Sequence, residues 1–158
     1  PGEFKIKEGD FVVVTTARGT ECGEVVRAAH EVPGFSREVK PVIRVADAVD
    51  VRRMRQIYQQ NMETYTCWVR QYFPAEICVT RPQGSFLLWV ELPEKVDMVC
   101  VSKQLCRLKI QAAAGSLFSA SGKYRNCLRI NVALPPTDKN RDALKKMGEA
   151  IVIAMEEG

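Results

Sequence analysis

The sequence predicts an α+β protein in which a small, barrel-like β element is joined by a long helix to a sheet of three or four strands with helices packed on it. β-branched runs dominate the first third, an apolar stripe of helical period follows, and short strands then alternate with helices. With 158 residues, of which 46% are hydrophobic and 27% charged, the chain has the composition of a globular protein.

Three short strands are expected in the first third of the chain. Residues 11–16 are rich in β-branched side chains, a turn at 18–20 follows, and a second strand covers residues 22–28. After a loop marked by the Pro-Gly pair at 33–34, residues 41–45 form a third strand. Because three short strands are marginally stable alone, we expect them to curl into the small barrel-like element.

A long helix is predicted over residues 47–73. Apolar and aromatic residues recur there every three or four positions, which indicates one core-facing stripe. Asp47 or Asp50 can cap the first turn, and Pro74 marks the end.

The remainder of the chain alternates between strands and helices. The expected strands are 77–80, 86–90, 110–113 and 127–132, of which 86–90 is apolar enough to be central. One helix begins after Asp97, and the last begins after Thr137 or Asp138. The residues expected to be buried on these two helices are Met98, Val101, Leu105, Leu108, Leu144, Met147, Ile151 and Ala154.

Charge and cysteine usage exclude several classes of protein. The basic residues behind the net charge of +4 are interleaved with acidic ones, so we expect no nucleic-acid partner. No apolar stretch approaches the ~20 residues that span a bilayer and no leader opens the chain, so we expect no membrane partner and no secretion. The six cysteines lie mostly in apolar runs, which favours buried, reduced thiols in a cytoplasmic protein. Residues 1–4 indicate a cloning remnant or an end left by processing.

No motif for nucleotide binding, zinc hydrolysis or serine hydrolysis is present. A nucleophile pair would have to be built on His30, which lies in a predicted loop. Neither a cysteine nor a second histidine stands at metal-ligand spacing from it. The sequence therefore predicts no catalytic residue and no metal site.

Residues 114–131 combine a loop of small residues with a strand that holds an arginine. Arg129 stands between two apolar residues, so on an alternating strand its side chain points to the opposite face. A guanidinium held in this way can offer two parallel N–H donors to a carboxylate or phosphate. Chemistry alone leaves two interpretations open, a surface or salt-bridged arginine and an anion-binding one. Gly115, Ser116 and Ser119 are the candidates for an anion-binding loop.

The same segment carries a resemblance to a known family. Residues 80–93, 114–119 and 124–131 resemble the C-terminal small domain of fold-type I, pyridoxal-phosphate-dependent aminotransferases. The resemblance is strongest to the aminotransferase-like part of MocR/GabR-type transcriptional regulators. It implies that Arg129 matches the arginine that binds the α-carboxylate of an amino acid, and that residues 115–118 lie near the mouth of the active site.

The resemblance also implies that pyridoxal phosphate is not bound by this chain. In the family, the Schiff-base lysine, the aspartate that faces the pyridine nitrogen and the phosphate-binding loop all lie in a large domain that has no match here. The lysines of the matching region that fail to match the cofactor positions are Lys95, Lys103, Lys109 and Lys123. We therefore expect no cofactor and no catalysis, with Arg129 as a vestigial substrate-binding residue.

The front of the chain resembles a different family. Residues 8–26 and 40–46 are similar to the YaaT-like family, the bacterial relatives of a yeast polymerase suppressor, over about residues 4–53. Two domains are therefore expected, a β-rich YaaT-like segment at 1–53 and an aminotransferase-like small domain at 54–158. The helix at 47–73 crosses the join.

Joining two families inside a helix predicts an artificial recombinant chimera that folds but has no catalytic function of its own. The alternative is a fragment of a pyridoxal-phosphate-dependent, aminotransferase-like transcriptional regulator that keeps a weak carboxylate-binding site at Arg129. A pyridoxal enzyme that works with a complementary large domain and a natural fusion regulator also stay open. Apolar surface left by the missing large domain predicts a homodimer or a segment-swapped oligomer.

Overall fold

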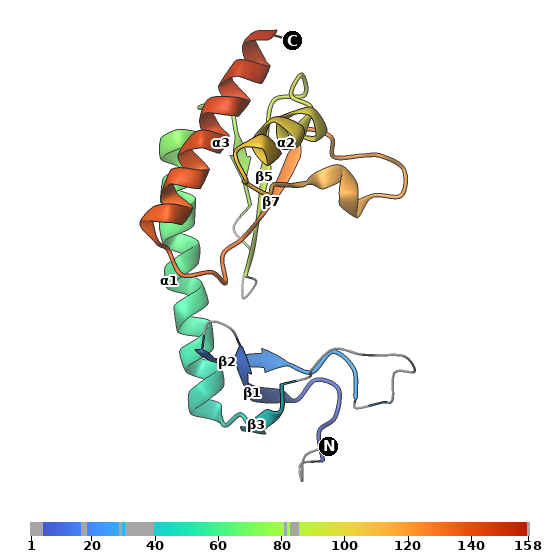
Figure 1. The fold of residues 1–158 in the computed structure, drawn as a ribbon, viewed down its shortest axis with the longest axis vertical. Helices are drawn as coiled ribbons and strands as arrows, with labels where there is room; N and C mark the ends of the chain where they lie inside the picture. The colour runs from blue at the N-terminus through green and yellow to red at the C-terminus, as the bar shows by residue number, and fades with distance from the viewer. Residues whose placement is uncertain are drawn as a thin grey trace. The chain divides into compact units, whose positions relative to one another are not determined.

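The computed structural model describes residues 5–16, 19–28, 30, 40–80, 82 and 86–157. The chain divides into two compact units, Pro1–Gln56, here the first unit, and Ile57–Gly158, the second unit (Figure 1). The opening residues 1–4, the loop at 33–34 and part of the turn at 18–20 lie outside the described residues.

The first unit contains a three-stranded antiparallel sheet. Strands β1 (Phe11–Thr16), β2 (Gly19–Glu24) and β3 (Val42–Val45) are arranged in the order β2-β1-β3. Both outer strands pair with β1, and the sheet formed by the described residues is open. The barrel-like element predicted from the sequence is therefore not confirmed.

The second strand lies earlier than the predicted range of 22–28. Thr16, the last residue of β1, pairs with Gly19, and Phe11, the first residue of β1, pairs with Glu24. The ladder between the two strands therefore ends at Glu24. Val26, whose β-branched side chain favoured a strand in the sequence, is 89% exposed. Register against β1 overrides the local propensity of this segment.

Helix α1 (Ala48–Tyr72) begins at a pair of reciprocal hydrogen bonds. The Asp47 carboxylate accepts the N–H groups of Val49 at 2.8 Å and of Asp50 at 2.9 Å. The Asp50 carboxylate in turn accepts the Asp47 N–H at 2.9 Å and forms an ion pair with Arg44. Both predicted capping residues are therefore used, in the arrangement of a capping box.

The second unit is built on a four-stranded antiparallel sheet. Strands β4 (Cys78–Val79), β5 (Leu87–Glu91), β6 (Ala113–Ala114) and β7 (Cys127–Asn131) are arranged in the order β4-β5-β7-β6. The two long strands β5 and β7 lie side by side at the centre of the sheet (Figure 1). The short strands β4 and β6 lie at its edges. The sequence predicted a sheet of three or four strands, and the strand expected near 86–90 is central in it. The strand expected at 110–113 is shorter and lies later, at Ala113–Ala114.

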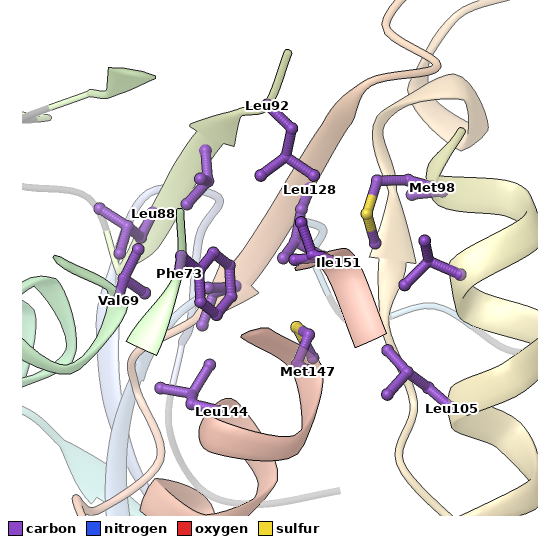
Figure 2. Close-up of a cluster of buried hydrophobic side chains, with 14 of the residues drawn as sticks. Val69, Phe73, Leu88, Leu92, Met98, Leu105, Leu128, Leu144, Met147 and Ile151 are labelled. Carbon is purple, nitrogen blue, oxygen red and sulfur yellow. The ribbon is translucent and has the colours of Figure 1, made fainter. Parts of the chain in front are cut away.

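The core of the second unit lies between one face of this sheet and three helices. Helices α1, α2 (Met98–Arg107) and α3 (Asp138–Glu157) all contribute buried side chains to one cluster with β5 and β7, and Figure 2 shows these side chains converging. Asp97 caps α2 by accepting the Val99 N–H at 2.8 Å. Thr137 accepts the Asn140 N–H at 3.3 Å at the start of α3. No helix among the described residues is long and apolar enough to cross a membrane.

Two expectations about buried side chains were wrong. Leu108 is 57% exposed, because α2 ends there and the chain turns away at Lys109, whose φ is +58°. Cysteines were expected to be buried, but only Cys127 is. The exposed thiols belong to Cys67, Cys78, Cys100 and Cys106. On α2, the two cysteines flank the buried stripe instead of belonging to it, since neighbouring helical positions face different directions.

Candidate functional site

Arg129 lies at the centre of β7, on the sheet face opposite the core. Its neighbours Leu128 and Ile130 are buried in the core cluster, whereas Arg129 is half-buried. In the sheet, Arg129 is opposite Trp89 of β5 and Ala113 of β6. The strand thus holds the arginine between two strands on the face that the helices leave uncovered.

Three aromatic residues, here called the aromatic cluster, form a series of ring contacts that begins at this arginine: Phe118, Trp89 and Tyr124. The Arg129 Cζ atom lies over the ring of Phe118, 3.8 Å from its centroid, which is cation–π geometry. Trp89 meets Phe118 edge-on with centroids 6.3 Å apart, and it meets Tyr124 at 5.6 Å with an angle of 88° between the rings. The described residues form no ion pair with Arg129. Its guanidinium is therefore held by stacking.

Gly115 opens the single 3-10 turn η1 (Gly115–Phe118) that carries Phe118. A Cβ atom on Gly115 would lie 2.6 Å from the Tyr124 carbonyl oxygen and 2.7 Å from the Cys127 Cβ, so only glycine fits this approach. Gly115 was predicted as part of an anion-binding loop. In the structure, the close packing of Tyr124 and Cys127 explains why a glycine stands at this position. Its place in the loop brings Phe118 and Tyr124 to the same sheet face.

The other two loop candidates have different surroundings. The Ser119 hydroxyl lies 3.1 Å from the Ser121 hydroxyl and accepts the Lys123 N–H at 3.2 Å, so it is used within the loop. Ser116 is half-buried, and its carbonyl accepts the Ser119 N–H at 3.2 Å. The structure therefore places both serines in one turn near Phe118, with Ser119 bonded inside that turn.

The end of this loop is fixed to the start of α2. Arg125 forms an ion pair with Asp97, and this contact holds the pKa of the Asp97 carboxyl below its usual range. The Arg125 carbonyl accepts the Met98 N–H at 2.8 Å. The Asn126 side-chain amide donates to the Leu92 carbonyl at 2.6 Å. These bonds fix the segment between the aromatic cluster and β7 at its C-terminal end.

A cavity of about 530 Å³ lies beside Arg129, between α2, α3 and the β6 side of β7. Core side chains such as Leu144 and Met147 contribute apolar surface, and Ser102, Asn131 and Asn140 add polar groups. Of the described residues that line this cavity, Arg129 alone carries a charge. The volume falls in the range of small-molecule sites.

The residues around this cavity do not fit pyridoxal phosphate. That cofactor needs a lysine amine for its Schiff base, and no lysine is among the described residues that line the cavity. Lys95 instead donates to the Met155 carbonyl near the end of α3. Among the described residues, no group of three or more histidine, cysteine, aspartate or glutamate side chains could hold a metal ion.

The sequence suggested Arg129 as a candidate binding residue and did not predict the residues that lie around it. The aromatic cluster could have been anticipated in part, because Trp89 lies on the strand predicted to be central in the sheet. The cavity could not, since Ser102, Asn131 and Asn140 come from three elements that only the fold brings together.

Comparisons with known proteins agree with the resemblance of the second part of the chain. A segment of 106 residues is 72% identical to the uncharacterized HTH-type transcriptional regulator YjiR of Escherichia coli, covering 67% of this chain and 23% of that protein. The uncharacterized HTH-type transcriptional regulator YdcR of E. coli is 28% identical over 63% of this chain and 21% of its own length. No protein-family model matches the chain.

A solved structure extends the comparison to the fold. A multiple substrate aminotransferase from Thermococcus profundus matches 70% of this chain and 27% of its own chain, with a TM-score of 0.64 and 19% identity. The chain spans about a quarter of the length of the curated relatives it matches. About two thirds of the chain is thus homologous to a part of YjiR and has the α+β fold of an aminotransferase-type small domain.

Proposed function

We propose that this chain carries the carboxylate-binding part of an aminotransferase-like transcriptional regulator, and that Arg129 binds the α-carboxylate of a small amino acid. The observation that carries the proposal is the position of Arg129. It is half-buried, has no ion pair among the described residues and is the one charged residue among those described around a cavity of about 530 Å³. A guanidinium in such a place binds a carboxylate through two parallel N–H donors.

The chain alone is proposed to bind without catalysing a reaction. The cavity offers a cation and hydrogen-bonding groups from Ser102, Asn131 and Asn140, but its described lining supplies no lysine or carboxylate to move a proton. Whether the chain binds pyridoxal phosphate by itself is tested by adding the cofactor and recording the absorbance. A Schiff-base band that survives dialysis would overturn the proposal that the chain holds no cofactor.

A titration with L-leucine tests carboxylate binding. We expect millimolar L-leucine to shift the Arg129 backbone amide and side-chain Nε–H resonances in nuclear magnetic resonance spectra, and isoamylamine, which lacks the carboxylate, to leave them unchanged. Arg129→Gln should abolish the shift of the residue-129 backbone amide, a signal that this variant retains. Arg107→Gln removes an exposed arginine of the same unit that does not line the cavity and should retain it. Equal responses to leucine and isoamylamine would contradict the proposal.

The recombinant origin of the chain also stays a proposal. What supports it is the YaaT-like pattern of residues 4–53 and the extent of the relatives, which match about two thirds of the chain. The test is the genome of the source organism. One intact reading frame across residues 52–60 would establish a natural protein and exclude an artificial join.

A further inference from the structure

The ring of Phe118 covers one face of the Arg129 guanidinium. We infer that Phe118 is a positioning residue for Arg129, because its ring, supported by Trp89 and Tyr124, fixes the plane in which the guanidinium presents its N–H donors to a carboxylate. The inference rests on the proposed function and deepens it. It names the residue that determines how the binding group is oriented.

The geometry of the contact supports this role. At 3.8 Å from the ring centroid, the Arg129 Cζ atom is well within the ~6 Å over which a ring attracts a cation. The guanidinium is planar and all its donors lie in that plane. A ring stacked over one face therefore restricts rotation of the group while leaving the N–H edge open to a ligand.

Phe118 has little other reason to be where it is. Its side chain is 45% exposed, so burial of the ring in the core does not explain its position. Its contacts are with Arg129 and Trp89, the two residues that face each other on β7 and β5. An exposed aromatic residue held over a cation indicates that the ring serves the arginine.

The protein holds Phe118 from two sides. On one side, Trp89 meets both Phe118 and Tyr124 edge-on, an arrangement that aromatic rings favour. On the other side, Gly115 lets the turn that carries Phe118 approach the Tyr124 backbone. Because a long arginine side chain has many rotamers, this rigid frame lowers the entropy lost when a carboxylate is bound.

The contact can be tested in the ligand-free chain of 158 residues. A stacked ring shifts the Arg129 Hδ and Hε resonances upfield and slows rotation about the guanidinium bonds. We expect Phe118→Leu to remove both effects and Phe118→Tyr, which keeps the ring, to retain them. Phe86→Leu is the matched control, because Phe86 is 43% exposed and its ring contacts Tyr58 instead of an arginine. An unchanged far-ultraviolet circular dichroism spectrum in each variant verifies that the unit is folded.

Binding of L-leucine is the second measurement, chosen because this ligand has no ring of its own. Phe118→Leu should weaken its affinity about two- to fivefold, the effect of an exposed cation–π contact, whereas Phe118→Tyr and Phe86→Leu should bind as the unmodified chain does. Arg129 resonances that do not change in Phe118→Leu would overturn the inference. Loss of the upfield shift in Phe118→Leu, together with no binding by the unmodified chain, supports the positioning of Arg129 and overturns the proposed function.

Discussion

The two units of this molecule are stabilised in different ways. In the first unit, the buried hydrophobic side chains among the described residues are Val12 and Val13, both on β1. In the second unit, one continuous cluster extends from Tyr65 on α1 to Ile151 on α3. Hydrophobic burial is the dominant favourable term in folding, so most of the stability of the chain belongs to the second unit.

The first unit depends more on polar contacts at its surface. The ion pair between Arg44 and Asp50 and the hydrogen bonds around Asp47 join β3 to the start of α1. Exposed ion pairs contribute little and are screened by salt. We therefore expect the first unit to open under conditions in which the second unit, which carries Arg129 and the cavity, stays folded.

Leu128→Ala should have the largest effect and should act on the second unit. Leu128 is fully buried between β7 and the helices, and its truncation is expected to cost about 4 kcal/mol through lost burial and the cavity left behind. Both tryptophans, Trp68 and Trp89, belong to the second unit, so urea unfolding followed by tryptophan fluorescence reports this change.

Val13→Ala is the matched change in the first unit. It truncates one of the two buried valines of β1, and it should leave the tryptophan-reported transition unchanged. Faster amide exchange in residues 11–16 would show that it acts locally. If Val13→Ala shifts the tryptophan transition as far as Leu128→Ala does, the two units unfold together and the contrast between them is wrong.

Gly148→Ala should destabilise the second unit by about 3 kcal/mol. A Cβ atom on Gly148 would lie 2.1 Å from the Tyr72 carbonyl oxygen, so α3 and the end of α1 would have to move apart. Gly23→Ala is the control in the first unit, because nothing lies within 4 Å of the added atom. Thermal unfolding measures both changes, and an equal shift in the two variants would contradict the close approach of the helices.

Asn61→Ala should cost about 2 kcal/mol, less than the two changes above. The Asn61 amide, 5% exposed, donates to the Val132 carbonyl at 2.9 Å and to the Leu134 carbonyl at 3.3 Å, and both acceptors would lose that donor. Gln60→Ala, at the adjacent exposed position, should change the urea midpoint little. A neutral Asn61→Ala would mean that water replaces the lost donor.

Strong local patterns predicted much of this fold. The β-branched run at 11–16 gave β1 with its bounds, and the capping aspartate at 97 gave the start of α2. The sequence-based prediction failed at positions whose structure depends on residues far away in the sequence or on the exact end of an element. Register against β1 ended β2 before Val26, and a turn at Lys109 left Leu108 in solvent.

The site was predictable to a smaller extent than the fold. The place of Arg129 on β7, with its two neighbours in the core, follows from strand alternation, and its role as a binding residue stays a prediction from the family resemblance. Phe118 could not, because its place over the guanidinium depends on a single 3-10 turn and on the absence of a side chain at Gly115. The buried position of Asn61 was also not predicted. Asn61 is a polar residue within an apolar helical stripe, and the sequence does not show that the Val132 carbonyl lies near enough to accept its hydrogen bond.

The smallest expected effect concerns Asp50, which should make the stability of the first unit depend on pH in the acid range. The Arg44 guanidinium and the Asp47 N–H lower the pKa of the Asp50 carboxyl from 3.8 to about 2. Because the unfolded chain binds this proton more tightly, the stabilisation is complete above about pH 4 and is lost as the pH falls toward 2. The protection factors of residues 42–56 against hydrogen exchange, which correct for the slower intrinsic exchange in acid, should therefore fall over this interval in the unmodified chain.

Two variants separate this effect from general acid unfolding. Residues 42–56 of Asp50→Asn should have lower protection factors than those of the unmodified chain at pH 5. These factors should vary less between about pH 4 and 2 and should converge with those of the unmodified chain below that range. Asp97→Asn removes a carboxyl whose pKa Arg125 lowers in the second unit, so it should leave exchange of residues 42–56 unchanged. If Asp50→Asn keeps the full acid dependence, another carboxyl controls the first unit. If Asp97→Asn also alters exchange in the first unit, the two units do not open independently.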